Sequence, residues 1–423
     1  MRIAVWHNLP SGGGKRALYD QVRSLVARGH QIEAWCPPTA DRSYLPLSSI
    51  VPEHVVPLPG FESTQYSGLQ RRLYQVRWNT WSQLRSMERH CRECARQMRV
   101  KDFDILFAAS CMLYYTPLIA RFVELPSVLY LGEPNRPLYE AQPELLWPAI
   151  NWTAKDLLSL RFWRKSLLRR LRLPRIRLLA REERNSAIAF DQILVNSFFS
   201  RESVLRAFGI DSKVCYLGIE TDQFANQHKA RESFVVSLGA IIPSKNVEFL
   251  VDAVGTVSAQ MRPRLDLIAN TIDDAYLDRI NQRAARSQVS IQVHQKISDA
   301  ELVGILNRAR IMLYASRLEP FGYAPLEACA CGTPVIATAE GGVRETIQDG
   351  VNGLLVEHEP KAMGAAIERL IADEQLRIEL GAKALALVRE KWSLAPSIDR
   401  LEHRLKELLT QIDSQRSHTK ETG

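Results

Sequence analysis

The sequence predicts an α/β protein with two Rossmann-like domains that face each other across a cleft. Three observations predict this fold. The chain has 423 residues, more than a single hydrophobic core usually organises. Short apolar strands alternate with helical stretches, a pattern typical of parallel sheets. A strand, a glycine loop and a helix open the chain, and a similar pattern restarts after a polar, linker-like stretch around residues 225–232.

The first domain is expected to span residues 1–224. Ile3–Trp6 reads as a strand, Ser11–Gly14 as a glycine loop, and Ala17–Arg28 as a helix that Gly29 terminates. Further strands are predicted at 31–35, 104–109, 127–131, 193–195 and 214–217.

The second domain is expected to span residues 232–394. In open parallel sheets, ligands bind at the carboxyl ends of the strands, so these ends are the places to look for a site. A helix at 395–412 is expected to pack back on the first domain, and the polar tail 413–423 is expected to be disordered. Strands are predicted at 234–239, 264–268, 291–293, 311–314 and 335–337.

Composition indicates a soluble cytoplasmic protein. Apolar residues make up 46% and charged residues 24% of the chain. The N-terminus lacks a signal-peptide core, and the longest uncharged run, 105–120, is too short to span a membrane. Seven scattered cysteines are typical of a reducing compartment.

Two groups of residues invite a metal interpretation, and we expect no metal at either. His90, Cys91 and Cys94 lie in a charged helical stretch that has no second cysteine pair at zinc-site spacing. Asp102 and Asp104 resemble the acidic pair of metal-dependent transferases, but they open a strand of the first domain. Plain structural roles explain both groups.

The positive charge is concentrated in the basic segment, residues 161–184. This segment holds ten Lys or Arg and two Glu, a net charge of +8, which equals the net charge of the whole chain. Leucines interleave with the arginines, Phe162 and Trp163 lead in, and Pro174 is expected to break the helix. The pattern favours a helix on an anionic membrane surface. A solvated or acceptor-site helix and nucleic-acid contact are the alternatives, and nucleic acid is the least favoured because stacking aromatics are not interleaved.

Chemistry-bearing residues gather between 314 and 353. A strand ends near Tyr314, and the loop after it carries Glu319 and Gly322. A helix is expected to start with Pro325, so that Ala324 is its cap and Glu327 lies in its first turn. Because alanine has no side-chain oxygen, the free N–H groups would form a site for an anion such as a diphosphate.

These residues resemble retaining glycosyltransferase family 4. The resemblance rests on Glu319 and Glu327, separated by seven residues, and on the segments that flank them. It covers nearly the whole chain apart from roughly 135–185 and the tail. The further matching segments are Ala328–Thr338, Gly341–Glu345, Asp349–Val356, Asn196–Ser200 and Gly218–Glu220.

The resemblance implies a GT-B fold and a role for each matching residue. Glu319 would contact hydroxyls of the donor sugar, and Glu327 would hold the ribose. Lys245 would neutralise the diphosphate leaving group; Lys245 and Glu319 are the expected catalytic residues. The remaining expected donor contacts are the backbone of Phe321 and Gly322 at the sugar and phosphates, Lys296 and Ile297 at the base, and Gly13 and Gly14 at the phosphates from the first domain.

The implied reaction transfers a hexose from a UDP- or GDP-linked sugar with retention at the anomeric carbon. Neither a metal nor another cofactor is expected. The acceptor is expected to be a lipid-linked or cell-envelope glycan at the inner membrane face, and a soluble acceptor is the alternative. No nucleic-acid partner is expected.

Two departures from the family pattern keep other functions open. Ala240 stands where an arginine is usual, and Gly132 stands where a histidine is common, in the segment Tyr130–Arg136. A protein that binds nucleotide or a partner without turnover is therefore one alternative. A sugar-nucleotide epimerase of the same fold is another, although the two glutamates and their spacing speak against it.

Overall fold

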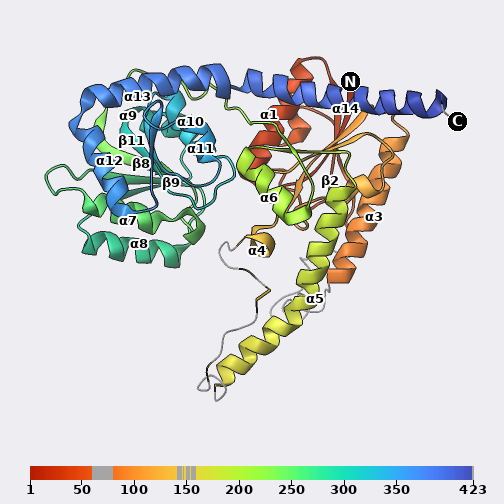
Figure 1. Cartoon of the computed structure of the whole chain (residues 1–423), viewed down its shortest axis with the longest axis horizontal. Coiled ribbons are helices and arrows are strands. Elements are labelled where there is room, and N and C mark those ends of the chain that lie inside the picture. Colours follow the sequence, from red (N-terminus) through yellow and green to blue (C-terminus); the bar gives the residue numbers. More distant parts are fainter. Residues whose placement is uncertain (60–79, 141–144, 146, 149–152, 154–158, 422–423) are drawn as a thin grey trace. The chain divides into compact units, whose positions relative to one another are not determined.

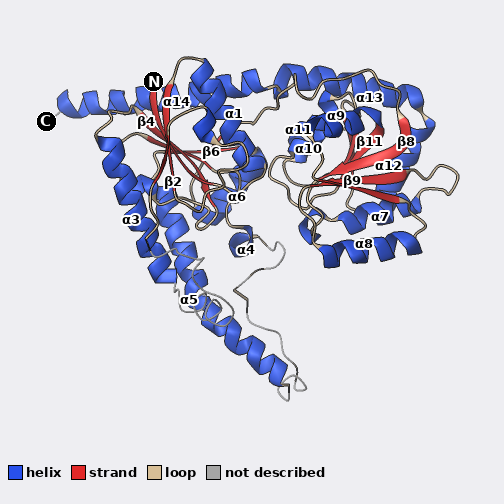
Figure 2. Cartoon of the chain, turned by 180° about the vertical axis from the view of Figure 1, so that it is seen from behind, coloured by secondary structure: helices blue, strands red, loops and turns tan. Residues whose placement is uncertain are grey.

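The computed structural model describes residues 1–59, 80–140, 145, 147–148, 153 and 159–421. The chain forms two compact units, each with one parallel sheet between helices (Figures 1 and 2). The N-terminal unit comprises 1–195, 201–214 and 401–423, and the C-terminal unit comprises 196–200 and 215–400. The predicted pair of Rossmann-like domains is therefore confirmed.

The N-terminal unit has a seven-stranded parallel sheet with the order β3-β2-β1-β4-β5-β6-β7. The strand order reverses between β1 and β4. From β1 the chain continues to β2 on one side, and from β4 it continues to β5 on the other side. The elements of this unit are β1 (Arg2–Asn8), α1 (Gly13–Ala27), β2 (Gln31–Cys36), η1 (Leu47–Ser49), β3 (Glu53–Val55), α3 (Thr80–Arg99), β4 (Ile105–Cys111), η2 (Ile119–Arg121), β5 (Ser127–Tyr130), α4 (Arg136–Tyr139), α5 (Leu160–Ile188), β6 (Gln192–Val195), α6 (Phe198–Phe208) and β7 (Lys213–Val214).

The C-terminal unit has a six-stranded parallel sheet with the order β10-β9-β8-β11-β12-β13. Its reversal point lies between β8 and β11. The elements are β8 (Glu232–Leu238), η4 (Pro243–Lys245), α7 (Val247–Thr256), β9 (Arg264–Ala269), α8 (Asp274–Arg286), β10 (Ile291–Gln295), α9 (Asp299–Arg308), β11 (Ala309–Tyr314), α10 (Tyr323–Ala330), β12 (Val335–Thr338), α11 (Val343–Thr346), β13 (Gly353–Val356), α12 (Pro360–Ala372), α13 (Glu374–Leu387) and η5 (Val388–Trp392), followed by α14 (Leu394–Glu421).

Each sheet builds a core from apolar strand residues and the helices that cover it. In the N-terminal unit, Trp6 and Leu106 pack with the apolar side of α3 and with Leu178 from the end of α5. In the C-terminal unit, Val235 and Leu313 pack with residues of α7, α8 and α12. Burial of both sheet faces explains why the strands read as short, continuous apolar runs.

The second domain begins earlier than predicted. Residues 215–224, expected in the first domain, belong to the C-terminal unit. Ile219 forms a parallel bridge with Ser393, and a Cβ on Gly218 would lie 2.4 Å from the Ser393 carbonyl oxygen. The backbone of Gly218 thus packs directly on that of Ser393, a contact between residues distant in sequence that no local pattern reveals.

Helix α14 continues beyond its predicted end. Residues 413–421, expected to be disordered, extend the helix. This stretch contains neither glycine nor proline, so nothing local terminates it. In the N-terminal unit, Glu402 of α14 pairs with Arg28 at 2.8 Å and with His30 at 3.2 Å, and Glu407 pairs with Lys213 at 3.0 Å.

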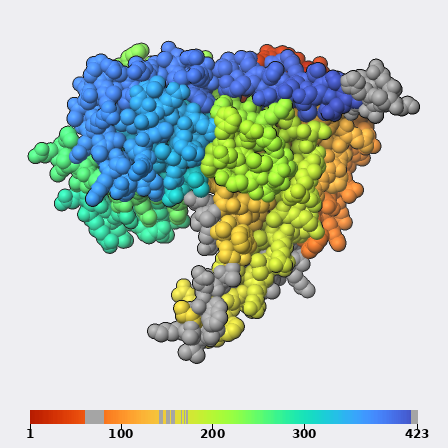
Figure 3. Space-filling model, viewed as in Figure 1, coloured from red at the N-terminus to blue at the C-terminus, as the bar shows by residue number. Residues whose placement is uncertain are grey.

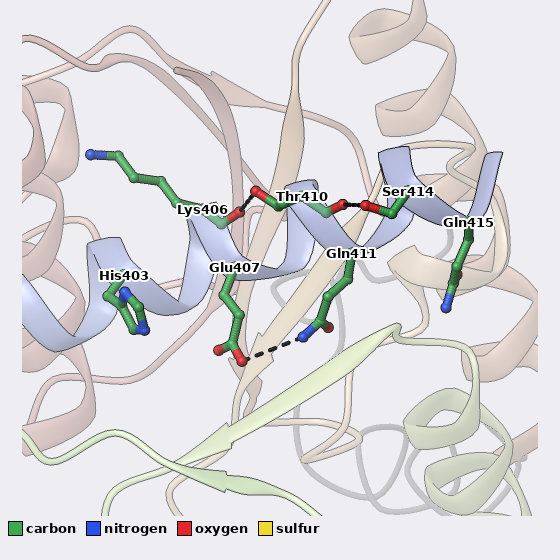
Figure 4. A pocket seen from close by; sticks show the side chains of 7 residues that line it. All are labelled: His403, Lys406, Glu407, Thr410, Gln411, Ser414 and Gln415. Carbon is green, nitrogen blue, oxygen red and sulfur yellow. Dashed lines mark hydrogen bonds between the residues drawn. The ribbon is translucent and has the colours of Figure 1, made fainter. Parts of the chain in front are cut away.

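A shallow pocket of about 550 Å³ follows one face of α14 (Figure 4). The dashed hydrogen bonds in it join residues one turn apart, such as Gln411 to Glu407 and Thr410 to the Lys406 carbonyl. We assign it no ligand. Its lining is His403, Lys406, Glu407, Thr410, Gln411, Ser414 and Gln415.

Helix α5 runs unbroken through Pro174, although the sequence predicted two pieces. Proline removes one N–H donor, which leaves the carbonyl of Arg170 without its helical partner. Because Pro174 is exposed, water can satisfy that carbonyl and the helix continues. Among the helices of the described residues, none is long and apolar enough to cross a membrane.

Candidate functional site

The candidate donor site lies where the strand order of the C-terminal sheet reverses. At such a point, the loops after two adjacent strands diverge and leave a crevice. The two strands are β8 and β11, and a small pocket of about 10 Å³ lies at their carboxyl ends. Its lining includes Gly239, Ala240, Lys245, Ala315 and Ser316. The predicted lysine is therefore at the reversal point.

Lys245 and Glu319, the two predicted catalytic residues, contact each other. The Lys245 ammonium donates to a Glu319 carboxylate oxygen at 2.5 Å, and both side chains are about one quarter exposed, at 27% and 24%. Lys245 closes the short helix η4, and Asn246 after it adopts a left-handed backbone with φ of 56°. Seventy-four residues of sequence separate the pair, and the parallel sheet brings them together.

The loop that carries Glu319 is held by a glycine pair. The N–H of Gly342 donates to the carbonyl of Glu319 at 2.8 Å. A Cβ on Gly341 would lie 2.4 Å from that carbonyl oxygen, and one on Gly342 would lie 2.0 Å from the carbonyl oxygen of Pro320. Any side chain at these two positions would push the loop away, which explains the glycines.

Helix α10 begins two residues before its predicted start. Gly322 is the N-cap, with φ of 89°, so Pro325 and Glu327 are the third and fifth helical residues. The left-handed conformation of glycine lets the chain enter the helix earlier than the proline suggested. Neither a capping side chain nor an acidic residue occupies the first turn. Both features suit an anion, and anion binding at this helix start stays a prediction.

Glu327 is buried in α10, with 4% of the residue exposed. The role expected for it, holding the ribose, stays a prediction. Lys296 and Ile297 follow β10 at the carboxyl edge of the same sheet, and the N–H of Lys296 donates to the Ala269 carbonyl at 3.1 Å. These residues lie on the same edge as Glu319, with β9 and β8 between β10 and β11.

Gly13 and Gly14 lie in the N-terminal unit, at the start of α1. This helix begins at Gly13 rather than at Ala17 as predicted, because Gly12 adopts a φ of 140° that ends the loop early. No side chain caps the helix, and its first turn has no acidic residue. The start of α1 follows β1, one of the two strands at the reversal point of this sheet.

A buried polar cluster beneath α1 was not predicted. Glu53 accepts a hydrogen bond from His7 at 3.0 Å, and the thiol of Cys36 lies 3.8 Å from the same oxygen. Burial is the main cause that raises the pKa of Cys36 to about 12, and burial lowers the pKa of His7. The ligand-type atoms of these three residues lie within 4.8 Å of one another. Their mutual hydrogen bonding accounts for the cluster, and the buried ammonium of Lys15 nearby disfavours a cation.

The two groups that invited a metal interpretation make ordinary structural contacts. His90 accepts from the Trp6 indole at 3.2 Å and bonds the Val56 carbonyl at 3.1 Å, while Cys91 and Cys94 are buried in the core. Asp104 accepts from the N–H of Arg2 at 2.7 Å, so it lies at the amino end of the sheet, opposite the edge that binds ligands.

Known proteins of similar sequence are glycosyltransferases. Residues 218–386 match the family Glycosyl transferases group 1. The chain is 29% identical over 238 residues to the human alpha-1,3/1,6-mannosyltransferase ALG2, covering 50% of this chain and 57% of that protein. It is 45% identical over 85 residues to a D-inositol 3-phosphate glycosyltransferase of Corynebacterium jeikeium, covering 20% of each chain. The chain thus spans about half or less of these curated relatives.

Solved structures share the fold across nearly the whole chain. Anabaena HepE in complex with UDP superposes with a TM-score of 0.70 at 17% identity, covering 96% of this chain and 100% of that one. Sucrose-phosphate synthase of Thermosynechococcus elongatus gives 0.69 at 16% identity, covering 97% and 99%. The chain therefore has the two-domain fold of GT-B glycosyltransferases, and the match to the family Glycosyl transferases group 1 lies within its C-terminal unit.

Proposed function

We propose that this protein is a retaining glycosyltransferase that moves a hexose from a UDP- or GDP-linked sugar to an acceptor without a metal ion. The observation that carries the proposal is the pair Lys245–Glu319 at the β8–β11 reversal point. Glu319 lies four residues before Tyr323, the first residue of α10, whose start has no capping side chain. A cation and a helix N-terminus suit a diphosphate, and a carboxylate suits sugar hydroxyls. The two relatives described above carry the names of sugar transferases, which supports the same reaction class.

The proposed chemistry begins with an exchange of partners. When the donor binds, Lys245 turns from Glu319 to the diphosphate, and the released carboxylate accepts hydrogen bonds from the hexose. As the bond to the sugar breaks, negative charge grows on the phosphate oxygens, where Lys245 and the N–H groups of α10 stabilise it. The leaving phosphate helps to deprotonate the acceptor on the same face, which retains the anomeric configuration.

A donor screen tests this proposal. Purified protein is incubated with UDP-glucose, UDP-galactose, UDP-N-acetylglucosamine and GDP-mannose, with and without EDTA, and release of UDP or GDP is measured. We expect turnover of one donor that EDTA leaves unchanged. Binding without turnover would instead support the alternative raised by Ala240 and Gly132. Conversion of the donor to another sugar nucleotide without an acceptor would indicate an epimerase.

Glu319 and Glu327 are expected to affect different kinetic constants. Glu327→Gln should raise KM for the donor with little change in kcat, because the ribose is the same in the ground and transition states. Glu319→Gln should lower kcat, because the hexose gains positive charge in the transition state. Steady-state kinetics with the donor found in the screen measure both constants. Identical changes in the two variants would contradict this division of roles.

We propose that the acceptor is a glycan on a lipid and that the basic segment, residues 161–184, docks the protein on an anionic membrane. The support is the exposure of the first turns of α5, which extend beyond α3 (Figures 1 and 3). Leu160, Trp163 and Leu167 are 89%, 52% and 58% exposed, whereas Ile176 and Leu178 are buried in the core. The exposed arginines of the segment are Arg161, Arg164, Arg170, Arg175, Arg177, Arg181 and Arg184.

Vesicle binding should depend on lipid charge and on salt. Each basic residue near an anionic surface contributes about 1 kcal/mol, and the exposed apolar side chains add their own burial. We expect sedimentation with phosphatidylglycerol vesicles at low salt, release at high salt, and little binding to phosphatidylcholine.

A five-arginine variant, with Arg161, Arg164, Arg170, Arg175 and Arg177 changed to Gln, should lose this binding while keeping its donor affinity. A second variant, with Leu160 and Trp163 changed to Ala, separates the apolar contribution from the charge. Binding that ignores lipid charge, or that survives the five changes, would favour a soluble acceptor.

A further inference from the structure

Three segments contact one another around Glu319: the loop that carries it and two segments that hold that loop. They are the donor loop, residues 319–322; the crossing segment, residues 196–200; and the glycine-pair segment, residues 341–345. All three belong to the C-terminal unit, although the chain on both sides of the crossing segment belongs to the N-terminal unit. The sequence marks the last two segments as part of the family resemblance but assigns them no role.

The crossing segment contacts the donor loop through one buried hydroxyl. Ser197 donates to the carbonyl of Pro320 at 2.6 Å, across 123 residues of sequence. Ser197 is fully buried, and its oxygen also accepts from the N–H of Ser200 at 2.9 Å. The hydroxyl of Ser200 donates to Asn196 at 2.7 Å. A hydroxyl has only one proton, so the short contact assigns the Ser197 proton to Pro320.

The donor loop is thereby fixed at two consecutive peptide groups. The Glu319 carbonyl accepts from the N–H of Gly342, and the Pro320 carbonyl accepts from Ser197. Because a trans peptide is planar, fixing the Pro320 carbonyl also fixes the N–H of Phe321 on the opposite side. Glu319, Phe321 and Gly322 are the residues of the loop that we expect at the donor, and the two fixed peptide groups lie directly before Phe321.

The third contact joins the glycine-pair segment to the crossing segment. Glu345 accepts hydrogen bonds from the N–H groups of Phe198 at 2.9 Å and Phe199 at 3.0 Å, the first residues of α6. The hydroxyl of Tyr216 donates to the same carboxylate at 2.8 Å. A carboxylate at a helix N-terminus satisfies free N–H groups and interacts favourably with the helix dipole. Ser197, directly before α6, is therefore held in place by the segment that also holds Glu319.

We propose that Ser197 is a positioning residue for sugar transfer: its hydroxyl holds the Pro320 carbonyl and so orients Glu319 and the Phe321 N–H toward the donor. This inference rests on the proposed function. Ser197 touches neither donor nor acceptor in this proposal and acts only through the loop. Removal of its hydroxyl leaves the half-buried Pro320 carbonyl without this donor and frees the loop to rotate.

Ser197→Ala tests the proposal, with Ser200→Ala as the matched control. Both variants remove one buried hydroxyl from the same segment, but only the first removes the bond to Pro320. We expect Ser197→Ala to lower kcat/KM for the donor by about 10- to 100-fold. Ser200→Ala should stay within about twofold. Hydrogen exchange at the amides of residues 321–323 should quicken in Ser197→Ala alone.

The outcomes separate this inference from the proposed function. If the wild-type protein transfers no sugar, the proposed function fails, and the exchange comparison still tests the positioning. Unchanged exchange at 321–323 in Ser197→Ala, or equal effects in both variants, would overturn the positioning role. Should Ser197→Ala not fold, Ser197→Cys fills the same space with a much weaker donor and should show the same losses.

Discussion

Lys245→Ala is expected to lower kcat far more than it weakens donor binding. Charge on the leaving diphosphate grows toward the transition state, so the contact with the ammonium strengthens there. Loss of one such group costs about 2 to 4 kcal/mol of barrier, or roughly 30- to 1,000-fold in rate. The measurement is kcat with the preferred donor, alongside a binding constant from calorimetry.

Because Lys245 pairs with Glu319, the effect of the substitution on Glu319 has to be separated from its effect on the donor. In the structure the two side chains are partners, so Lys245→Ala also removes this cation from Glu319. Both are partly exposed, so the pair itself contributes little to stability. Lys245→Arg keeps the charge but alters its geometry and should recover part of the rate. A near-normal rate in Lys245→Ala would show that the lysine serves only as a surface partner of Glu319.

The positions of most strands along the chain could be predicted because strands buried on both faces are continuous apolar runs. Most predicted strands overlap observed ones, with ends that differ by one or a few residues. The predicted strand 214–217 is the main exception, since β7 covers only Lys213–Val214. Two strands were missed for local reasons. The three-residue β3 contains Glu53 and His54 between prolines, and β13 begins with a glycine.

Contacts between distant residues could not be predicted. The family resemblance placed Lys245 and Glu319 in one site, but it did not indicate that their side chains pair with each other. The bond from Ser197 to Pro320 joins a small polar residue to a backbone carbonyl, and neither has a distinctive sequence signal. Predicted helix starts were wrong where a glycine is the N-cap. After Gly12 and Gly322 the helices begin earlier than the side-chain patterns indicated.

Two adjacent glutamates in α5 also make contacts that could not be predicted from the sequence. One of them leads to a second prediction, on stability. From the sequence, Glu182 and Glu183 only offset the charge of the basic segment. In the structure, Glu182 pairs with Arg121 at 2.7 Å and with Arg181 at 2.6 Å. Glu183 is fully buried and accepts from the Asn135 amide at 3.1 Å. Burial raises the pKa of Glu183 to about 7, and the hydrogen bonds from Asn135 and Tyr139 offset this only in part.

Glu183→Gln is therefore expected to stabilise the protein at pH 8 and to have little effect at pH 4.5. Below its unfolded pKa, near 4.3, Glu183 is neutral in both states and costs nothing. As the pH rises from there through about 7, the unfolded chain releases the proton first, so the free energy of unfolding falls. The loss reaches about 3 to 4 kcal/mol above pH 7, and the glutamine variant, which is always neutral, avoids it.

Urea unfolding at several pH values, followed by tryptophan fluorescence, measures this effect. The quantity to compare is the difference between variant and wild type, because other titrating groups cancel in it. Glu182→Gln is the control on the same turn of α5: it removes a carboxylate paired with two arginines and should lower stability at pH 8. A Glu183→Gln difference that stays constant from pH 4.5 to 8 would mean that Glu183 ionises normally in the folded protein. Its oxygens would then need hydrogen-bond donors beyond Asn135 and Tyr139, or a nearby cation, because a carboxylate this buried stays charged only with such compensation.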